Sequence, residues 1–484
     1  MEEINLEEIK QKTTVSVVFL SLRNLGIQGV SIIGFFLLTI LLGTGEVGLF
    51  AIVAESVGIL GYFSDIGLAS ALIQQKDEVT KDELQTTFLI QQILVIISLI
   101  IFSFIFSKIT FSKSYGSKEI WIFISLCFAF FAASLKTIPS VLLERKLNFK
   151  LMSTIDILEN ISFYLIAVIF AFFHFGAYSY AIATFIRSLL GLILIYKFNP
   201  WPIGYAFSKT AAKRLFKYGI PFQLNSFIAM AKDRLSNLLV AGIIGRESFG
   251  ILSWAQKGPR IPLSFMDAIM RVTFPTFSRL QDKAEILKRS LEKSLYFIAL
   301  FVFPALAGIA LIAPDIINVI PKYSKWAPAI LPLYFYAVSY AIAAVTTPIT
   351  NAFNAVGKIT ITTKLMIMWT ILTWIFYPIL SLKYGYLGTS YATLIVGSSS
   401  LIVWIVAQNI FKLNIFKVIL HPFISTVLVI IGLLILQLAP LSPLLLIFSK
   451  VTLGLLIYAT YHLTICRREV NWFISQTKWF LNKR

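Results

Sequence analysis

The chain has 484 residues, of which 58% are hydrophobic and 13% are charged, and its mean hydropathy is +0.83. Soluble domains carry about 25% charged residues, so this composition excludes a soluble globular protein and predicts an all-α integral membrane protein. The formal net charge of +19 does not require a nucleic-acid partner, because membrane topology accounts for it.

Long apolar runs, separated by short polar or Gly/Pro breaks, predict about fourteen transmembrane helices. With the N-terminus in the cytoplasm, most of the 42 Lys and Arg residues fall on cytoplasmic segments, as the positive-inside rule requires. We therefore expect both termini in the cytoplasm. In chain order, the expected helices cover residues 14–42, 46–73, 84–107, 119–143, 151–173, 177–196, 215–244, 247–277, 294–313, 326–353, 359–380, 386–410, 418–437 and 443–464.

An internal duplication relates the first two expected helices to the seventh and eighth. These pairs run in the same direction, which predicts parallel repeats about an axis along the membrane normal. A shift of 202 residues aligns, without a gap, Leu37, Gly43, Gly48, Ile59, Phe63 and Asp65 with Leu239, Gly245, Gly250, Ile261, Phe265 and Asp267.

The duplication predicts two pseudo-symmetric six-helix lobes followed by two appended helices. Two lobes with a site between them suit transport by alternating access. The expected divisions are an N-terminal lobe over 1–198, a cytoplasmic linker over 199–214, a C-terminal lobe over 215–412, the appended helices over 413–466 and a basic cytoplasmic tail over 467–484.

Three segments resemble polysaccharide-exporting flippases of the Wzx type, a branch of the multidrug/oligosaccharidyl-lipid/polysaccharide (MOP) exporter superfamily. The resemblance follows the order and number of spans over nearly the whole chain. The segments are Pro139 to Lys150 with its Arg145-Lys146-Leu147-Asn148-Phe149-Lys150 run, Phe274-Pro275-Thr276-Phe277-Ser278-Arg279-Leu280-Gln281-Asp282, and Asp65-Ile66-Gly67-Leu68 running to Leu72-Ile73-Gln74.

This resemblance implies transport without covalent chemistry, so we expect no enzyme activity. The implied cargo is a polyprenyl-diphosphate-linked oligosaccharide, moved from the inner to the outer leaflet of the bacterial cytoplasmic membrane for O-antigen, exopolysaccharide or capsule export. The implied partners are this lipid-linked cargo, membrane lipids and polysaccharide-polymerase machinery, without nucleic acid.

Charged side chains inside the apolar spans indicate what a transport cavity would bind. A charge at the centre of a membrane helix costs about 2.5–3.5 kcal/mol on insertion scales, so it faces protein or a water-filled cavity. Most of these charges are cationic, and the fixed donor fork of Arg suits a diphosphate. As substrate-binding residues we predict Arg23, Lys232, Arg234, Lys257 and Arg260.

Other charges in the spans also have a structural interpretation. Lys136 and Arg187 fit partners inside the first lobe, with Glu159 within reach of Arg187. Asp267 and Arg271, four residues apart, fit an ion pair near the membrane surface.

The acidic residues leave two interpretations open. Each carboxylate inside a span either couples transport to an H⁺ or Na⁺ gradient or is a fixed partner for the excess basic groups. The candidates for ion coupling or gating are Glu55, Asp65, Asp156, Glu159 and Asp267. Because the two Cys and three His residues stand singly, we expect no metal centre and no bound cofactor.

Two other functions compete with a flippase. A multidrug cation antiporter of the MATE type, from the same superfamily, would have the same fold but an acid-dominated cavity, whereas bases outnumber acids in these spans. A membrane-embedded glycosyltransferase or polymerase would need a sizeable external catalytic loop, and the external segments here are short.

Overall fold

A computed structural model describes residues 26–75, 77–113, 116–146 and 148–467 of the chain. Within these ranges the protein consists of helices joined by short connections, with no β-strand. The expected all-α class is therefore confirmed. The chain divides into two compact units, Met1–Gly250 and Ile251–Arg484.

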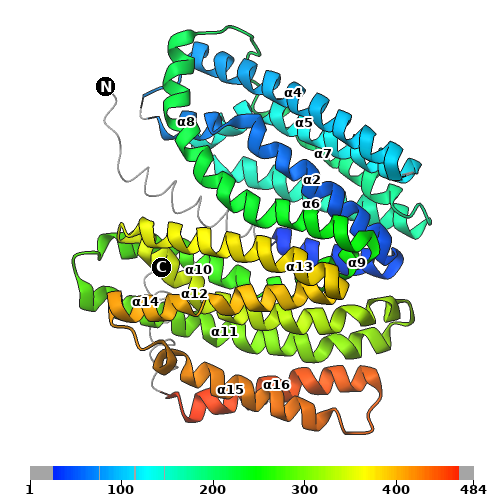
Figure 1. The fold of residues 1–484 in the computed structure, drawn as a ribbon, viewed down its shortest axis with the longest axis vertical. Coiled ribbons are helices and arrows are strands. Elements are labelled where there is room, and N and C mark those ends of the chain that lie inside the picture. The colour runs from blue at the N-terminus through cyan, green and yellow to red at the C-terminus, as the bar shows by residue number, and fades with distance from the viewer. Residues whose placement is uncertain (1–25, 76, 114–115, 147, 468–484) are drawn as a thin grey trace. The chain divides into compact units, whose positions relative to one another are not determined.

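The first unit begins, in its described part, with a helix over Gly26–Leu41. In this unit α5 and α6 both pack on α7, and α2 packs on α4 and α5 (Figure 1). The later elements are α2 (Thr44–Asp65), α3 (Leu68–Gln74), α4 (Lys81–Lys113), α5 (Ser117–Arg145), α6 (Phe149–Phe172), α7 (Tyr178–Phe198), α8 (Lys209–Met230), the π-helix η1 (Ala231–Leu235) and the start of α9 (Ser236–Arg260).

In the second unit, α11 packs against α12, α15 and α16, and Figure 1 shows α15 and α16 side by side at the end of the chain. The apolar core of this unit is formed mainly by α11 and α12, together with α10 and α14. Its elements are α10 (Leu263–Arg279), α11 (Ala284–Val319), the 3₁₀-helix η2 (Pro321–Ala329), α12 (Ile330–Ala355), α13 (Ile359–Ser399), α14 (Ile402–Phe411), α15 (Ile415–Leu436) and α16 (Pro443–Thr464).

The described residues contain 11 helices that are long and apolar enough to cross a membrane. This number is compatible with the fourteen expected, because some long helices contain more than one expected span. The stretch Ile359–Phe411 covers two of them, and a left-handed Gly385 (φ 60°) interrupts its backbone. The first expected span, at 14–42, lies partly outside the described residues.

The unit boundary at Gly250 lies within α9, beyond the linker that we expect over 199–214. Residues 199–208 are indeed non-helical, but α8 and η1 pack with the first unit through α2 and α3. The lobe divisions expected from the sequence remain a prediction.

Large apolar side chains cover much of the outer surface of these helices. Ile100 and Phe104 on α4 are 64% and 63% exposed, and Leu382 on α13 is 73% exposed. A soluble protein rarely exposes so many large apolar groups over whole helices, so this surface is suited to lipid. The protein is a multi-pass membrane protein.

Two glycines allow α2 and α9 to touch backbone to backbone. A Cβ atom on Gly48 would lie 1.8 Å from the carbonyl oxygen of Arg246, and one on Gly250 would lie 2.0 Å from that of Thr44. The two contacts exchange under the shift of 202 residues, because Gly48 aligns with Gly250 and Thr44 with Arg246. The repeats therefore meet through their own equivalent residues.

We predict that Gly48→Ala forces α2 and α9 apart and lowers the stability of the protein by about 1–3 kcal/mol, as overpacking does elsewhere. Thermal unfolding of the purified protein in detergent measures this change. Gly61→Ala is the matched control on the same helix, because a Cβ atom there meets nothing within 4 Å. Equal unfolding temperatures for the two variants would contradict the close contact.

A buried ion pair attaches α16 to α11. Lys450 Nζ lies 2.5 Å from Asp315 Oδ2 and donates to the carbonyl oxygen of Leu311 at 2.9 Å, and both charged side chains are only 2% exposed. Gln437, just after α15, also accepts from Lys450. This cluster fixes how the two appended helices pack on the rest of the second unit.

Removing only one charge of this pair leaves the other buried without compensation, which typically costs 3–5 kcal/mol. We therefore predict a large fall in unfolding temperature for Lys450→Met. The double variant Lys450→Met with Asp315→Leu should recover most of the loss, because no buried charge remains. A double variant as unstable as the single one would contradict this explanation. It would show that the attraction between the two charges, and not the burial of an unpaired charge, accounts for the loss of stability.

Candidate functional site

An ion pair joins α2 to η1 inside the first unit. Arg234 Nη1 donates to Glu55 Oε2 at 3.0 Å, and Asn237 Nδ2 donates to Glu55 Oε1 at 3.3 Å. The Arg234 side chain remains 39% exposed and the Glu55 side chain 27%. A single carboxylate cannot occupy all five donors of a guanidinium, so Arg234 is held in place with donors still accessible.

Gly58 makes room for this guanidinium. A Cβ atom on Gly58 would lie 2.1 Å from Arg234 Nη1, so a side chain at this position would occupy the space of Arg234. Gly58 follows Glu55 by three residues and thus lies on the same face of α2. The α2 face therefore supplies both the carboxylate and the space that place Arg234.

The π-helix η1 carries three consecutive charges. Lys232 Nζ pairs with Asp233 Oδ1 at 2.9 Å, and Lys232 is the less exposed of the two, at 24% against 64%. π-helical turns are rare and often occur at functional sites. Asp233 neutralises Lys232 and Glu55 neutralises Arg234, so each cation of η1 has its own acidic partner.

A second cluster lies between α5, α6 and α7. Glu159 Oε1 lies 2.5 Å from Lys136 Nζ, and Glu159 Oε2 lies 3.7 Å from Arg187 Nε. Glu159 is buried, and Gly191 on α7 leaves it space, since a Cβ atom there would collide with Oε1. This is the pairing inside the first lobe that the sequence left open. Glu159 is thus a bridge between two bases.

Asp65 is the last residue of α2, and its carboxylate reaches the first turn of α3. Its two carboxylate oxygens accept from the backbone N–H of Ala69 at 3.1 and 3.2 Å. The chain turns here through Ile66 (φ 46°) and Gly67 (φ 74°), both left-handed. A Cβ atom on Gly67 would lie 2.5 Å from the carbonyl oxygen of Gly219, so α8 passes directly over this turn. The observed contacts of Asp65 are those of a helix cap.

The remaining predicted residues are spread over both units, and one lies outside the described part. Lys257 and Arg260 are exposed on the last turn of α9, and Asp267 is exposed on α10. Arg23 lies outside the described residues. Asp156, half-buried on α6, forms interactions of its own.

The expected single span over 247–277 is broken in two. Helix α9 ends at Arg260 and α10 begins at Leu263, with Pro262 as its N-cap. Arg260 and Asp267 therefore lie on different helices. Within the described residues, no ion pair joins Asp267 to Arg271, although the two share α10.

The comparisons with known proteins place this chain in a family. The family described as "Polysaccharide biosynthesis protein" matches residues 37–331, more than half of the chain. The chain belongs to this family.

Two known proteins are similar to this family member over more than half of their length. It is 22% identical over 367 residues to the lipopolysaccharide biosynthesis protein WzxC of Escherichia coli, covering 75% of this chain and 74% of that protein. It is 23% identical over 301 residues to the teichuronic acid biosynthesis protein TuaB of Bacillus subtilis, covering 61% of each. The chain thus spans about three fifths of TuaB.

Solved structures establish the fold. The lipid II flippase MurJ, in an inward closed conformation, matches with a TM-score of 0.73 at 16% identity, over 93% of this chain and 99% of that chain. An inward-facing MATE-family multidrug resistance transporter of the MOP superfamily matches with a TM-score of 0.57 at 14% identity, over 83% and 98%. The expected MOP-superfamily fold is confirmed.

Sequence analysis missed one ion pair at the start of α5. Arg246 Nη1 donates to Glu119 Oε1 at 2.7 Å, and the Glu119 side chain is 6% exposed. Both residues stand at expected span ends, where charges are ordinary, so nothing in the sequence marked them. The buried pair of Asp315 and Lys450 was missed as well, because helical periodicity cannot join residues that lie 135 positions apart.

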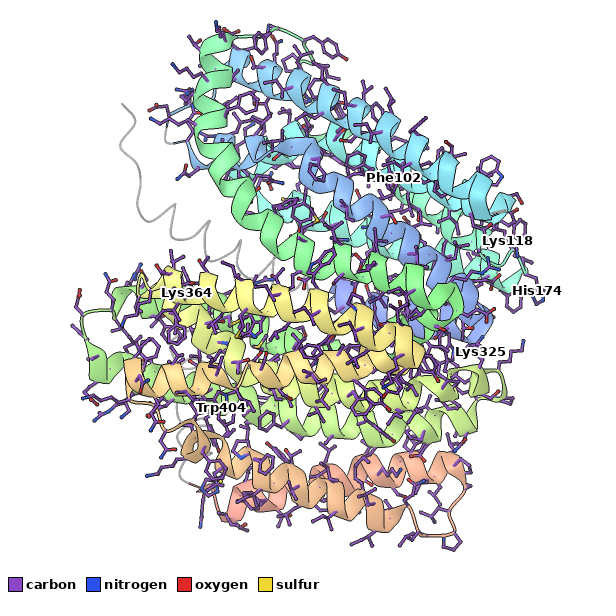
Figure 2. The ribbon with its side chains drawn as sticks, viewed as in Figure 1. Phe102, Lys118, His174, Lys325, Lys364 and Trp404 are labelled. Carbon is purple, nitrogen blue, oxygen red and sulfur yellow. The ribbon has the colours of Figure 1, made fainter. Side chains whose placement is uncertain are left out.

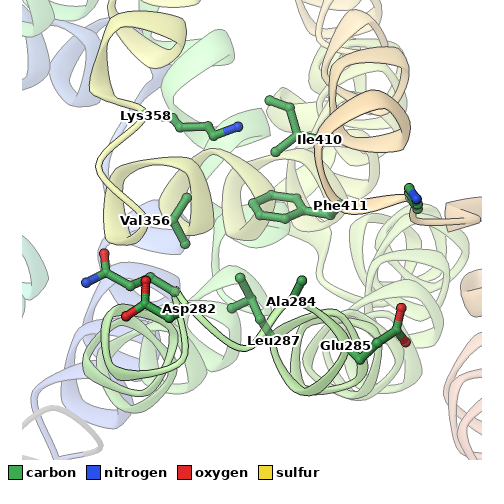
Figure 3. Close-up of a pocket in the computed structure, with 10 residues that line it drawn as sticks. Asp282, Ala284, Glu285, Leu287, Val356, Lys358, Ile410 and Phe411 are labelled. Carbon is green, nitrogen blue, oxygen red and sulfur yellow. The ribbon is translucent and has the colours of Figure 1, made fainter.

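A separate hollow lies at one end of the second unit (Figure 3). It has a volume of about 340 Å³ and is lined centrally by Val356 and Phe411. Lys358 lies at one rim, with Asp282 and Glu285 at the opposite rim (Figure 3). This mixed charge does not favour an anion, and none of the predicted site residues lines the hollow.

Gly58→Ala tests how Arg234 is placed in this family member. We predict that the new methyl group displaces the guanidinium and lowers polysaccharide production to the level of Arg234→Ala, while the protein still folds. The amount of polysaccharide that the cells make and the amount of inserted protein are measured together. Gly61→Ala, one turn further along α2, should support normal production, and normal production with Gly58→Ala would contradict this arrangement.

Proposed function

We propose that this protein is a flippase for a polyprenyl-diphosphate-linked oligosaccharide. The observation that carries the proposal is Arg234, a guanidinium held partly exposed within an apolar, membrane-crossing stretch by Glu55. A cation in that setting attracts an anion, and a diphosphate matches its donor fork. The similar proteins WzxC and MurJ are named for lipopolysaccharide biosynthesis and for flipping lipid II.

In this proposal Arg234 and Lys232 contact the diphosphate in the first unit, together with Arg23. Lys257 and Arg260 form a second cationic set at the end of α9. The protein lies in the bacterial cytoplasmic membrane with both termini in the cytoplasm, moves its cargo to the outer leaflet by alternating access, and catalyses no covalent step. Its partners are lipid-linked cargo and polysaccharide-polymerase machinery.

Coupling to an ion gradient belongs to the same proposal. When the diphosphate binds Arg234, it competes with Glu55, and a carboxylate released from its cationic partner takes up a proton or Na⁺ more readily. Glu159 already bridges two bases, so Glu55 is the better candidate.

The test is complementation of a strain that lacks the gene and accumulates lipid-linked glycan at the cytoplasmic face. We predict that Arg234→Ala lowers the export rate about 10- to 100-fold, the loss expected when a hydrogen bond to a charged group, worth about 1.5–3 kcal/mol, disappears. Arg23→Ala and Arg260→Ala should also fail although each protein is inserted. Lys322→Ala, an exposed lysine of η2, is the control.

Normal export by Arg234→Ala, with the glycan cleared from the cytoplasmic face, would refute the anion site. A MATE-like cation antiporter remains the second candidate, because the partly exposed Glu55 is also a possible cation ligand. That function predicts that Glu55→Gln abolishes efflux of cationic drugs. It also predicts that deleting the gene leaves polysaccharide export unchanged.

A further inference from the structure

An apolar groove runs along α5 and α7 on the surface of the first unit. Its volume is about 800 Å³, within the range of about 300–1,000 Å³ that is usual for ligand pockets. Trp121 and Ile124 on α5 are 57% and 48% exposed, and Phe185 on α7 is 43% exposed. None of the substrate-binding residues predicted above lines it. The groove is therefore separate from the proposed anion site.

One end of this groove is polar. There Ser117 and Tyr178 share a hydrogen bond of 2.5 Å between the first turns of α5 and α7. Lys118 is exposed one turn before Trp121 and so lies on the same side of α5. Figure 2 places Lys118 and His174 at this end of the unit.

The Lys118 ammonium lies beside the turn that enters α7. A Cβ atom on Gly176 would lie 3.8 Å from Lys118 Nζ, and the preceding residue, Phe175, lines the groove. Two acidic side chains are also near this end. Glu46 Oε2 accepts from the backbone N–H of Gly43 at 2.9 Å while Glu46 Oε1 lies beside Gly176, on the same side as Lys118, and Glu119 pairs with Arg246. Lys118 thus supplies a positive charge at the mouth of an apolar groove.

The length of the groove fits one membrane leaflet. On α7 it extends from Tyr178 to Ile186, eight residue steps, or about 12 Å at 1.5 Å per residue. Half of a hydrocarbon core about 30 Å thick is close to this length. Because the groove starts where α5 and α7 start, its polar end lies at headgroup depth, where Trp and Tyr side chains commonly gather.

We propose that this groove binds one acyl chain of an anionic phospholipid whose phosphate contacts Lys118. A cation at headgroup depth followed by about one leaflet of apolar surface matches a single phospholipid chain. A polyprenyl chain is much longer than the groove, so the cargo's own tail is the less suitable occupant. This inference does not depend on the proposed transport function.

Photolabelling of the full-length protein tests the proposal. The protein is reconstituted in phosphatidylcholine nanodiscs with a small amount of phosphatidylglycerol that carries a diazirine on its acyl chain. We expect adducts, mapped by mass spectrometry, on residues 121–125 and 181–186, and we expect unlabelled phosphatidylglycerol, but not additional phosphatidylcholine, to suppress them. Lys118→Ala should lower labelling about fivefold, the effect of one lysine at an anionic lipid surface.

Two further variants separate groove binding from general lipid contact. Ile182→Trp fills the groove and should suppress the adducts, whereas Ile193→Trp, at a 55% exposed position of α7 outside the groove, should not. Lys322→Ala should label like the unchanged protein. Three outcomes would overturn the proposal. The adducts could be unaffected by the choice of competing headgroup, they could persist in Ile182→Trp, or they could be suppressed only by a polyprenyl phosphate.

Discussion

Ion pairs join helices of this protein that are otherwise largely apolar. A charge that meets neither water nor an opposite charge is costly in such surroundings, so each base in the interior limits which helix can lie beside it. Among the described residues, the pairs that link separate helices include Arg234 with Glu55, Lys136 and Arg187 with Glu159, Arg214 with Glu83, Arg246 with Glu119 and Lys450 with Asp315.

These pairs differ in how completely they are enclosed. Lys450 and Asp315 are sealed from solvent, and their contribution is to packing. Arg234 and Glu55 make the same kind of contact but stay partly exposed. A cation that stays partly exposed inside an expected span can exchange its partner for a ligand, whereas Arg246, which is 54% exposed, stands between two expected spans where charges are ordinary. For this reason the proposed function depends on Arg234.

Much of the fold follows from the sequence, because length, hydropathy and turn-forming glycines act locally. The apolar runs predict the helices, and Gly245 (φ 79°) lies in the break expected between the helices at 215–244 and 247–277. The partners of the charges do not follow in the same way. Helical periodicity gives the face on which Arg234 lies but not its neighbour, which is 179 residues away. The π-helical turn at 231–235 also has no clear sequence signal, whereas Pro259 and Pro262 do mark the break before Leu263.

The contact between Gly48 and Gly250 limits how the two halves of the gene can diverge. Neither position has a side chain to shorten, so a bulkier residue at one cannot be compensated by a smaller one at the other. Elsewhere in the duplicated segment, one copy is free to drift once its partner adapts. Evolution of new specificities in this protein should therefore alter the residues around the contact between α2 and α9 and leave Gly48 and Gly250 unchanged.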